Sequence, residues 1–69
     1  MGEMMTINGE KRAVAAATVI ELLEAEAIDP TAKFVAVAVN GSVVPRRSWP
    51  DVSINPGDDI EIVHPAPGG

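Results

Sequence analysis

Cysteine is absent from this chain of 69 residues, and aromatic residues are scarce, with one Trp, one Phe and no Tyr. Without cysteine, the chain has no disulfide, no thiolate nucleophile and no thiolate ligand for a metal. His64 is the only histidine, so a structural zinc site made from the chain's own side chains is excluded as well. A chain of this size therefore depends on one small hydrophobic core.

Positive charge is also scarce, because 5 Lys and Arg residues stand against 10 Asp and Glu residues, for a net charge of -5. This sign disfavours a nucleic-acid partner and favours a basic protein surface. No apolar run approaches the roughly 20 residues of a membrane span, and no basic and apolar leader precedes the domain. We therefore expect a cytoplasmic protein with no membrane partner.

Two Asn-Gly pairs, Asn8-Gly9 and Asn40-Gly41, predict two β-hairpins. Asn-Gly is the strongest short hairpin signal, because a type I′ turn needs positive φ at both central residues. Apolar and polar side chains alternate around both pairs, and again before the last residues of the chain. We expect strands at residues 5–8, 11–14, 34–39, 43–44 and 59–63.

One helix is predicted between the two hairpins. Thr18 and Glu21 form a capping box, in which each side chain accepts a hydrogen bond from the other residue's amide. Apolar side chains then fall on one helical face. Pro30 cannot continue a helix, so the helix should end near residues 27–29 after two to three turns.

This order of elements predicts an α+β fold of the β-grasp type, in which one helix covers a mixed sheet of four or five strands. Another small α+β sandwich is the alternative. The domain would comprise residues 1–64, followed by a C-terminal tail at 65–69. The expected core consists of the apolar helix stripe and the inward strand residues Ile7, Val37, Val39, Ile60 and Ile62.

The third strand is apolar on both faces, so it is either central or part of a contact surface. Its larger residues point to the core, and Phe34, Ala36 and Ala38 lie on the other face. We regard these three as candidate docking residues. Asp58 and Asp59 are turn residues by type, and their functional alternative is docking to a basic patch on a partner.

Three further side chains have two possible roles each. Arg46 and Arg47 are predicted to lie in a solvated loop, with a partner or phosphate contact as the alternative. Trp49 is expected to be partly buried over one end of the sheet, with an interface anchor as the alternative.

The sequence ends in Gly68-Gly69, which residues 64–67 separate from the last predicted strand. A terminal carboxylate on an arm without side chains can enter the active site of another enzyme and be activated there. Glycine has no Cβ, so Gly68 and Gly69 can pass through a narrow channel. Pro65, Ala66 and Pro67 would form a stiff, extended approach to it. A frayed terminus or a cloning scar is the alternative.

Residues 37–49 read Val-Ala-Val-Asn-Gly-Ser-Val-Val-Pro-Arg-Arg-Ser-Trp. This run resembles the mid-chain signature of the ThiS family, the ubiquitin-like sulfur carriers of thiamine biosynthesis. Gly57-Asp58 before an apolar strand and the terminal Gly-Gly extend the likeness over residues 5–69. The Val-Pro-Arg-x-x-Trp run favours ThiS over the molybdopterin-synthase carrier. Two departures are the extension at residues 1–3 and the proline-rich run at 65–67.

The resemblance implies a carrier and not an enzyme, with no bound cofactor or metal. A ThiF-type adenylating enzyme, using ATP and magnesium, would adenylate Gly69, and a cysteine desulfurase would supply the sulfur for a thiocarboxylate. Thiazole synthase would then consume that sulfur. Three alternatives stay open: a molybdopterin-synthase-type or other sulfur carrier, a protein-modifying tag, and a plain β-grasp interaction module.

Overall fold

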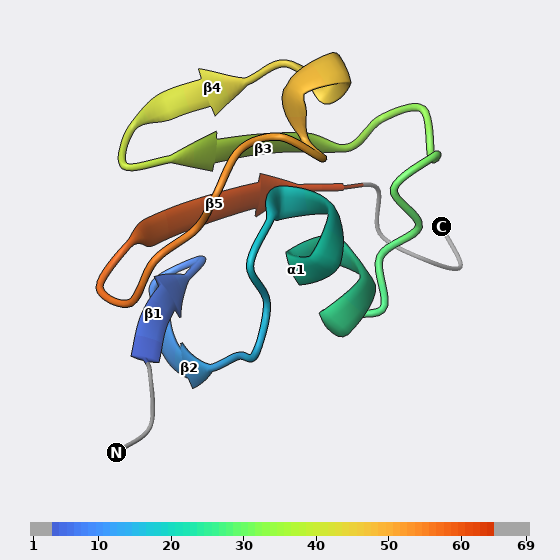
Figure 1. Ribbon diagram of the computed structural model, residues 1–69. Coiled ribbons are helices and arrows are strands. Elements are labelled where there is room, and N and C mark those ends of the chain that lie inside the picture. The colour runs from blue at the N-terminus through green and yellow to red at the C-terminus, as the bar shows by residue number, and fades with distance from the viewer. Residues whose placement is uncertain (1–3, 65–69) are drawn as a thin grey trace.

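The computed structural model describes residues 4–64, which form a five-stranded sheet with one α-helix packed on one face (Figure 1). The predicted α+β arrangement is therefore confirmed. In chain order the elements are β1 (Met4–Ile7), β2 (Glu10–Ala13), α1 (Val19–Ala25), β3 (Ala36–Val39), β4 (Ser42–Val44), the 3₁₀ helix η1 (Arg46–Ser48) and β5 (Asp59–Val63). Neither described helix is long and apolar enough to cross a membrane.

The last strand lies in the middle of the sheet, whose strand order is β2-β1-β5-β3-β4. β5 pairs in parallel with β1 and antiparallel with β3, so the sheet is mixed. Both hairpins, β1–β2 and β3–β4, are antiparallel. The last described strand is therefore central, with a neighbouring strand on each side.

Both Asn-Gly pairs adopt the predicted backbone. Asn8 and Gly9 have φ values of 51° and 84°, and Asn40 and Gly41 have values of 52° and 84°. Positive φ at both positions is the requirement of a type I′ turn. The two hairpins therefore follow from local sequence.

The two asparagine side chains also bind the central strand. Asn8 accepts a hydrogen bond from the Ile62 amide at 2.8 Å and donates to the Ile62 carbonyl at 3.2 Å. Asn40 accepts from the Asp59 amide at 2.9 Å and donates to the Asp58 carboxylate at 3.1 Å. Each asparagine lies just after the strand that pairs with β5, β1 for Asn8 and β3 for Asn40, and its side chain continues the contact with β5.

The helix begins as predicted at Thr18, whose hydroxyl accepts a hydrogen bond from the Glu21 amide at 3.2 Å. The reciprocal bond differs from the prediction, because Glu21 accepts from the Ala17 amide at 2.8 Å.

The helix ends at Ala25, earlier than predicted. Ala27 has a left-handed φ of 60°. The Ile28 amide donates to the Leu23 carbonyl at 2.8 Å, and the Ala27 amide donates to the Glu24 backbone carbonyl at 3.1 Å. This is a Schellman closure, made with alanine where glycine is usual.

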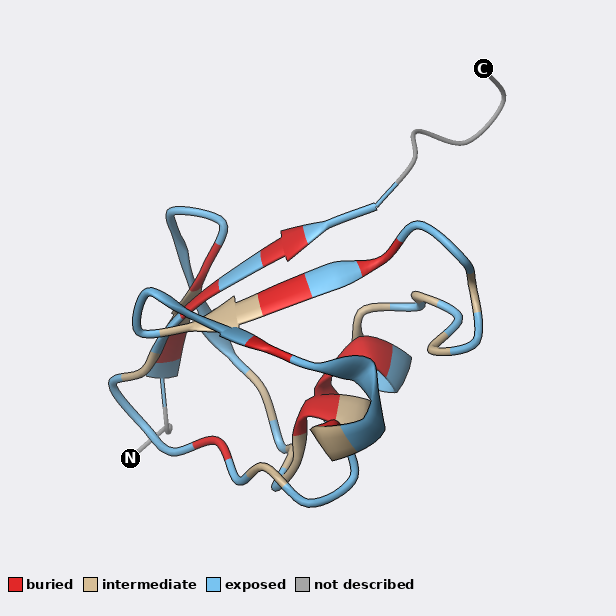
Figure 2. Cartoon of the chain, turned by 90° about the horizontal axis from the view of Figure 1, so that it is seen from above, coloured by how far each residue is buried: buried red, intermediate tan, exposed pale blue. Residues whose placement is uncertain are grey.

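The core lies between α1 and the sheet face that it covers, as the buried segments in Figure 2 show. Four of the five predicted strand positions are buried, and Val39 is half-buried at the edge of the core. The buried residues are Met5, Ile7, Val19, Leu22, Leu23, Val35, Val37, Val44, Trp49, Ile54, Ile60 and Ile62.

The segment after β4 differs from the prediction at Trp49, which was expected to be only partly buried. Trp49 is fully buried, at 1% exposure, and its indole N–H donates to the Val44 carbonyl at 2.9 Å. Arg46 and Arg47 are exposed as predicted, but they lie in η1, and the Arg46 guanidinium donates to the carbonyls of Pro30, at 2.5 Å, and Ala32. It also stacks 4.6 Å from the centre of the Trp49 ring. Arg46 therefore connects η1 to the loop between α1 and β3.

Candidate functional site

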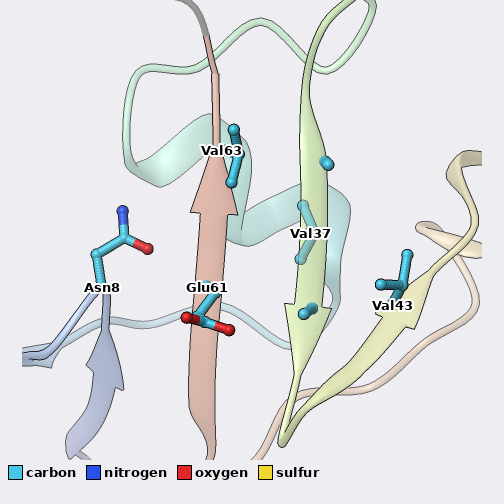
Figure 3. Close-up of a pocket in the computed structure, with 7 residues that line it drawn as sticks. Asn8, Val37, Val43, Glu61 and Val63 are labelled. Atoms are coloured by element: carbon cyan, nitrogen blue, oxygen red, sulfur yellow. The ribbon is translucent and has the colours of Figure 1, made fainter.

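The sheet face opposite α1 has no helix on it among residues 4–64, and it carries a shallow groove of about 300 Å³ (Figure 3). Apolar side chains from three neighbouring strands form most of its walls. The lining residues are Asn8, Ala36, Val37, Ala38, Val43, Glu61 and Val63. We call this surface the open-face groove.

The groove reaches the end of β5. Val63, the last residue of that strand, pairs with Ala36 on β3 and is 66% exposed. Val43, on β4, is 75% exposed. The predicted tail at residues 65–69 and its modification site lie outside the described residues. A partner that contacts the chain just after β5 would lie beside exposed apolar side chains.

A second hollow, of about 280 Å³, lies on the other side of the strand end, and His64, Ile28 and Val35 are among its lining residues. Asp29 also lines it, and the amide and hydroxyl of Thr31 donate to its carboxylate at 2.9 and 2.7 Å. These hydrogen bonds hold the pKa of Asp29 below its ordinary value. This hollow is thus bordered by a carboxylate that stays ionised near neutral pH.

The predicted acidic docking pair lies away from the strand end. Asp59 is the first residue of β5 and is exposed. Asp58 is half-buried and accepts hydrogen bonds from the Asn55 amide, at 2.8 Å, and from Asn40. Asp58 therefore has the turn role that its residue type predicted, and its side chain already has partners within the domain. A docking role for either residue stays a prediction.

The described residues contain no group of three or more His, Asp or Glu side chains that could hold a metal ion. Their polar side chains are hydrogen-bonded or exposed, since none of their buried side-chain polar atoms lacks a partner. The open-face groove can therefore contact another apolar surface, and the Glu61 carboxylate lies within it.

Comparison with known proteins identifies the family. A model of the ThiS family matches residues 2–69. The chain belongs to the ThiS family. The crystal structure of thiamine biosynthesis protein ThiS from Geobacter metallireducens is similar, with 32% identity and a TM-score of 0.76 over 96% of this chain and 99% of that one. A solution structure of a thiamine biosynthesis protein from the same organism gives 32% identity and a TM-score of 0.75, over 100% and 88% of the chains.

This ThiS-family chain also matches a thiazole synthase from Paramagnetospirillum magneticum, with 38% identity over 65 residues. The match covers 94% of the chain and 20% of that protein. The chain thus spans about a fifth of the length of this curated relative. The solved ThiS structures match over nearly their whole length, which confirms the predicted β-grasp fold.

The structure of this ThiS-family chain brings together some predicted docking residues and adds others. Ala36 and Ala38 both line the open-face groove, whereas Phe34 precedes β3 and is 75% exposed outside the lining. Sequence reasoning missed Val43 and Val63. Alternation could have found both, because each is next to a residue that is buried on the opposite face of its strand.

Proposed function

We propose that this ThiS-family chain is a sulfur carrier of thiamine biosynthesis, whose Gly69 carboxylate is adenylated and then converted to a thiocarboxylate. The observation that carries the proposal is the family match over residues 2–69. The two C-terminal glycines support it, because they give the reacting carboxyl group an arm without side chains. In this proposal the carrier is not itself a catalyst.

The chemistry requires activation by a partner. A carboxylate is a poor electrophile, because its charge repels nucleophiles and oxide is a bad leaving group. Reaction with ATP, bound with magnesium by a ThiF-type enzyme, gives an acyl adenylate and pyrophosphate. Hydrosulfide then attacks the acyl carbon and AMP leaves; an enzyme persulfide would attack in the same way, and a thiol would then reduce the S–S bond to release the thiocarboxylate. The product, a thiocarboxylate at Gly69, holds sulfur covalently for later delivery, as group carriers do.

A cysteine desulfurase is the proposed source of sulfur, and thiazole synthase is the proposed acceptor enzyme. Support for the acceptor comes from the relative in Paramagnetospirillum magneticum that is named thiazole synthase, because a stretch of that protein is similar to nearly the whole of this chain.

The proposed docking surface is the open-face groove, in which Ala38 on β3 pairs with Val43 on β4 and with Glu61 on β5. Ala38→Glu should weaken binding to the adenylating enzyme at every salt concentration, because it adds a second carboxylate beside Glu61 in a desolvated contact. Asp59→Lys should slow association more at low salt than at high salt, since exposed charges are screened beyond about 10 Å at 0.1 M. Asp59 is the cleaner choice, because Asp58→Lys would also remove hydrogen bonds within the domain. Unchanged kinetics in folded Ala38→Glu protein would exclude this docking face.

Intact-mass measurement tests the function directly. With the ThiF-type enzyme, ATP, magnesium and sulfide, the mass should rise by about 16 Da as one carboxyl oxygen is replaced by sulfur. Deleting Gly69, or adding one residue after it, should abolish the shift. A shift that persists in either variant contradicts the proposal. Adducts on lysines of other proteins would instead indicate a protein-modifying tag.

A further inference from the structure

One carboxylate lies within the apolar open-face groove. Glu61 is the only charged residue among the groove's lining residues, and its side chain is exposed on the central strand β5 (Figure 3). Its cross-strand neighbour on β3 is Ala38. The ion pair found within residues 4–64 joins Arg12 to Glu26, at 3.1 Å on the other side of the sheet, and does not involve Glu61.

Glu61 has no evident role in holding the described fold together. Glutamate is depleted in strands, where β-branched side chains fit better. Opposite charges directly across two strands stabilise a sheet, but alanine stands opposite Glu61 on β3. Its side chain is in none of the hydrogen bonds or ion pairs found among residues 4–64. The charge is therefore available to a partner.

Its position relates it to the end of the strand. Glu61 and Val63 are two residues apart on the same face of β5, which corresponds to about 7 Å. Val63 is the last residue of the strand. Any surface that receives the chain immediately beyond β5 and rests on the apolar groove also covers Glu61. Docking would remove this carboxylate from water, which costs free energy unless the partner supplies a compensating charge.

We propose that Glu61 determines specificity in docking, by pairing with a lysine or arginine that the adenylating enzyme presents among apolar side chains. This inference rests on the proposed function, because it takes the enzyme that activates Gly69 as the partner. Two observations support a cationic partner: Glu61 has no counter-ion in the described domain, and the chain as a whole carries a net charge of -5. An entirely apolar partner surface would leave the desolvated carboxylate unpaired.

The test is adenylation kinetics with Glu61→Gln, which keeps the side-chain shape and removes the charge. We expect its KM for the carrier to rise by about 10-fold or more with little change in kcat, because the partner's cation is left desolvated and unpaired. Glu61→Lys should raise KM further through repulsion. Glu24→Gln is the matched control, because Glu24 is exposed on α1 and its substitution changes the net charge by the same amount as Glu61→Gln. The KM of the Glu24→Gln carrier should stay within about twofold of the wild-type KM.

The outcomes separate this inference from the proposed function. If wild-type carrier is not adenylated, the proposed function fails and the inference fails with it. If wild type is adenylated and Glu61→Gln has a wild-type KM, the inference alone is overturned. Normal KM together with increased light scattering would show that Glu61 serves solubility instead. Equal losses in Glu61→Gln and Glu24→Gln would show a general charge effect, which also overturns the inference.

Discussion

Replacing Arg46 by alanine should destabilise the domain, although the residue is exposed. Its guanidinium donates to the carbonyls of Pro30 and Ala32, with a longer contact to Lys33, and it stacks on the buried Trp49 ring. A planar guanidinium can bind several carbonyls in a fixed geometry, which a shorter side chain cannot reproduce. The loop between α1 and β3 would lose this connection to η1.

The expected loss is about 2 kcal/mol. Hydrogen bonds from a charged donor contribute about 1.5–3 kcal/mol each when well buried, and water replaces much of that here because Arg46 is exposed. An exposed cation–π contact adds about 0.5–1 kcal/mol. A loss of 2 kcal/mol lowers Tm by about 8–16 °C in a domain of this size. It is a large share of the roughly 3–5 kcal/mol that so small a core provides.

Thermal and urea unfolding, followed by circular dichroism, measure the effect. Arg46→Lys keeps the positive charge but loses the planar set of N–H donors, so the free energy of unfolding should fall by about 1 kcal/mol. Arg47→Ala is the control, because Arg47 is exposed and makes no hydrogen bond or ion pair within residues 4–64. It should stay within about 0.5 kcal/mol of wild type. Arg46→Ala with wild-type stability, or equal losses in Arg46→Ala and Arg47→Ala, would refute this account of Arg46.

Three further predictions follow from local contacts. Ala27→Gly should stabilise the domain by about 1 kcal/mol, because the residue has a left-handed φ of 60°; a lower Tm contradicts this. Trp49→Phe should lose about 1–3 kcal/mol in urea unfolding, because the Val44 carbonyl loses its buried donor. Hydrogen bonds from Thr31 lower the pKa of Asp29 in the folded state. The Asp29 carboxylate therefore stabilises the fold at pH values above its ordinary pKa of 3.8, and this stabilisation is lost as the pH falls through the lowered pKa. The stability difference between wild type and Asp29→Asn should therefore narrow on acidification; a constant difference would be inconsistent with the lowered pKa.

Features set by neighbouring residues were predictable from the sequence. Asn-Gly favours positive φ at both positions, so the positions of both turns followed from residue type. Thr18 was identifiable as the N-cap because its hydroxyl acts on an amide three residues away. Alternation assigned Ile60 and Ile62 to the core and Ala36 to the opposite face.

Features that depend on distant segments were not predictable. Arg46 binds carbonyls 14 and 16 residues earlier, and no local periodicity indicates such a contact. The hydrogen bonds of Asn8 to Ile62 span 54 residues. The open-face groove joins the β3–β4 hairpin to the distant strand β5, so alternation could place Val43 and Val63 on one face of their own strands but could not show that the two line the same groove.

The position of β5 suits a carrier of the proposed kind. An edge strand is hydrogen-bonded to one neighbour only, whereas a central strand is held on both sides. β5 is hydrogen-bonded to β1 on one side and to β3 on the other. The Asn40 side chain accepts a hydrogen bond from Asp59, the first residue of β5, and the Asn8 side chain accepts one from Ile62, the last buried residue of β5. These asparagines are also the first of the two central residues in each type I′ turn, so the same residues that form the hairpins hold Asp59 and Ile62 of the strand that leads toward Gly69.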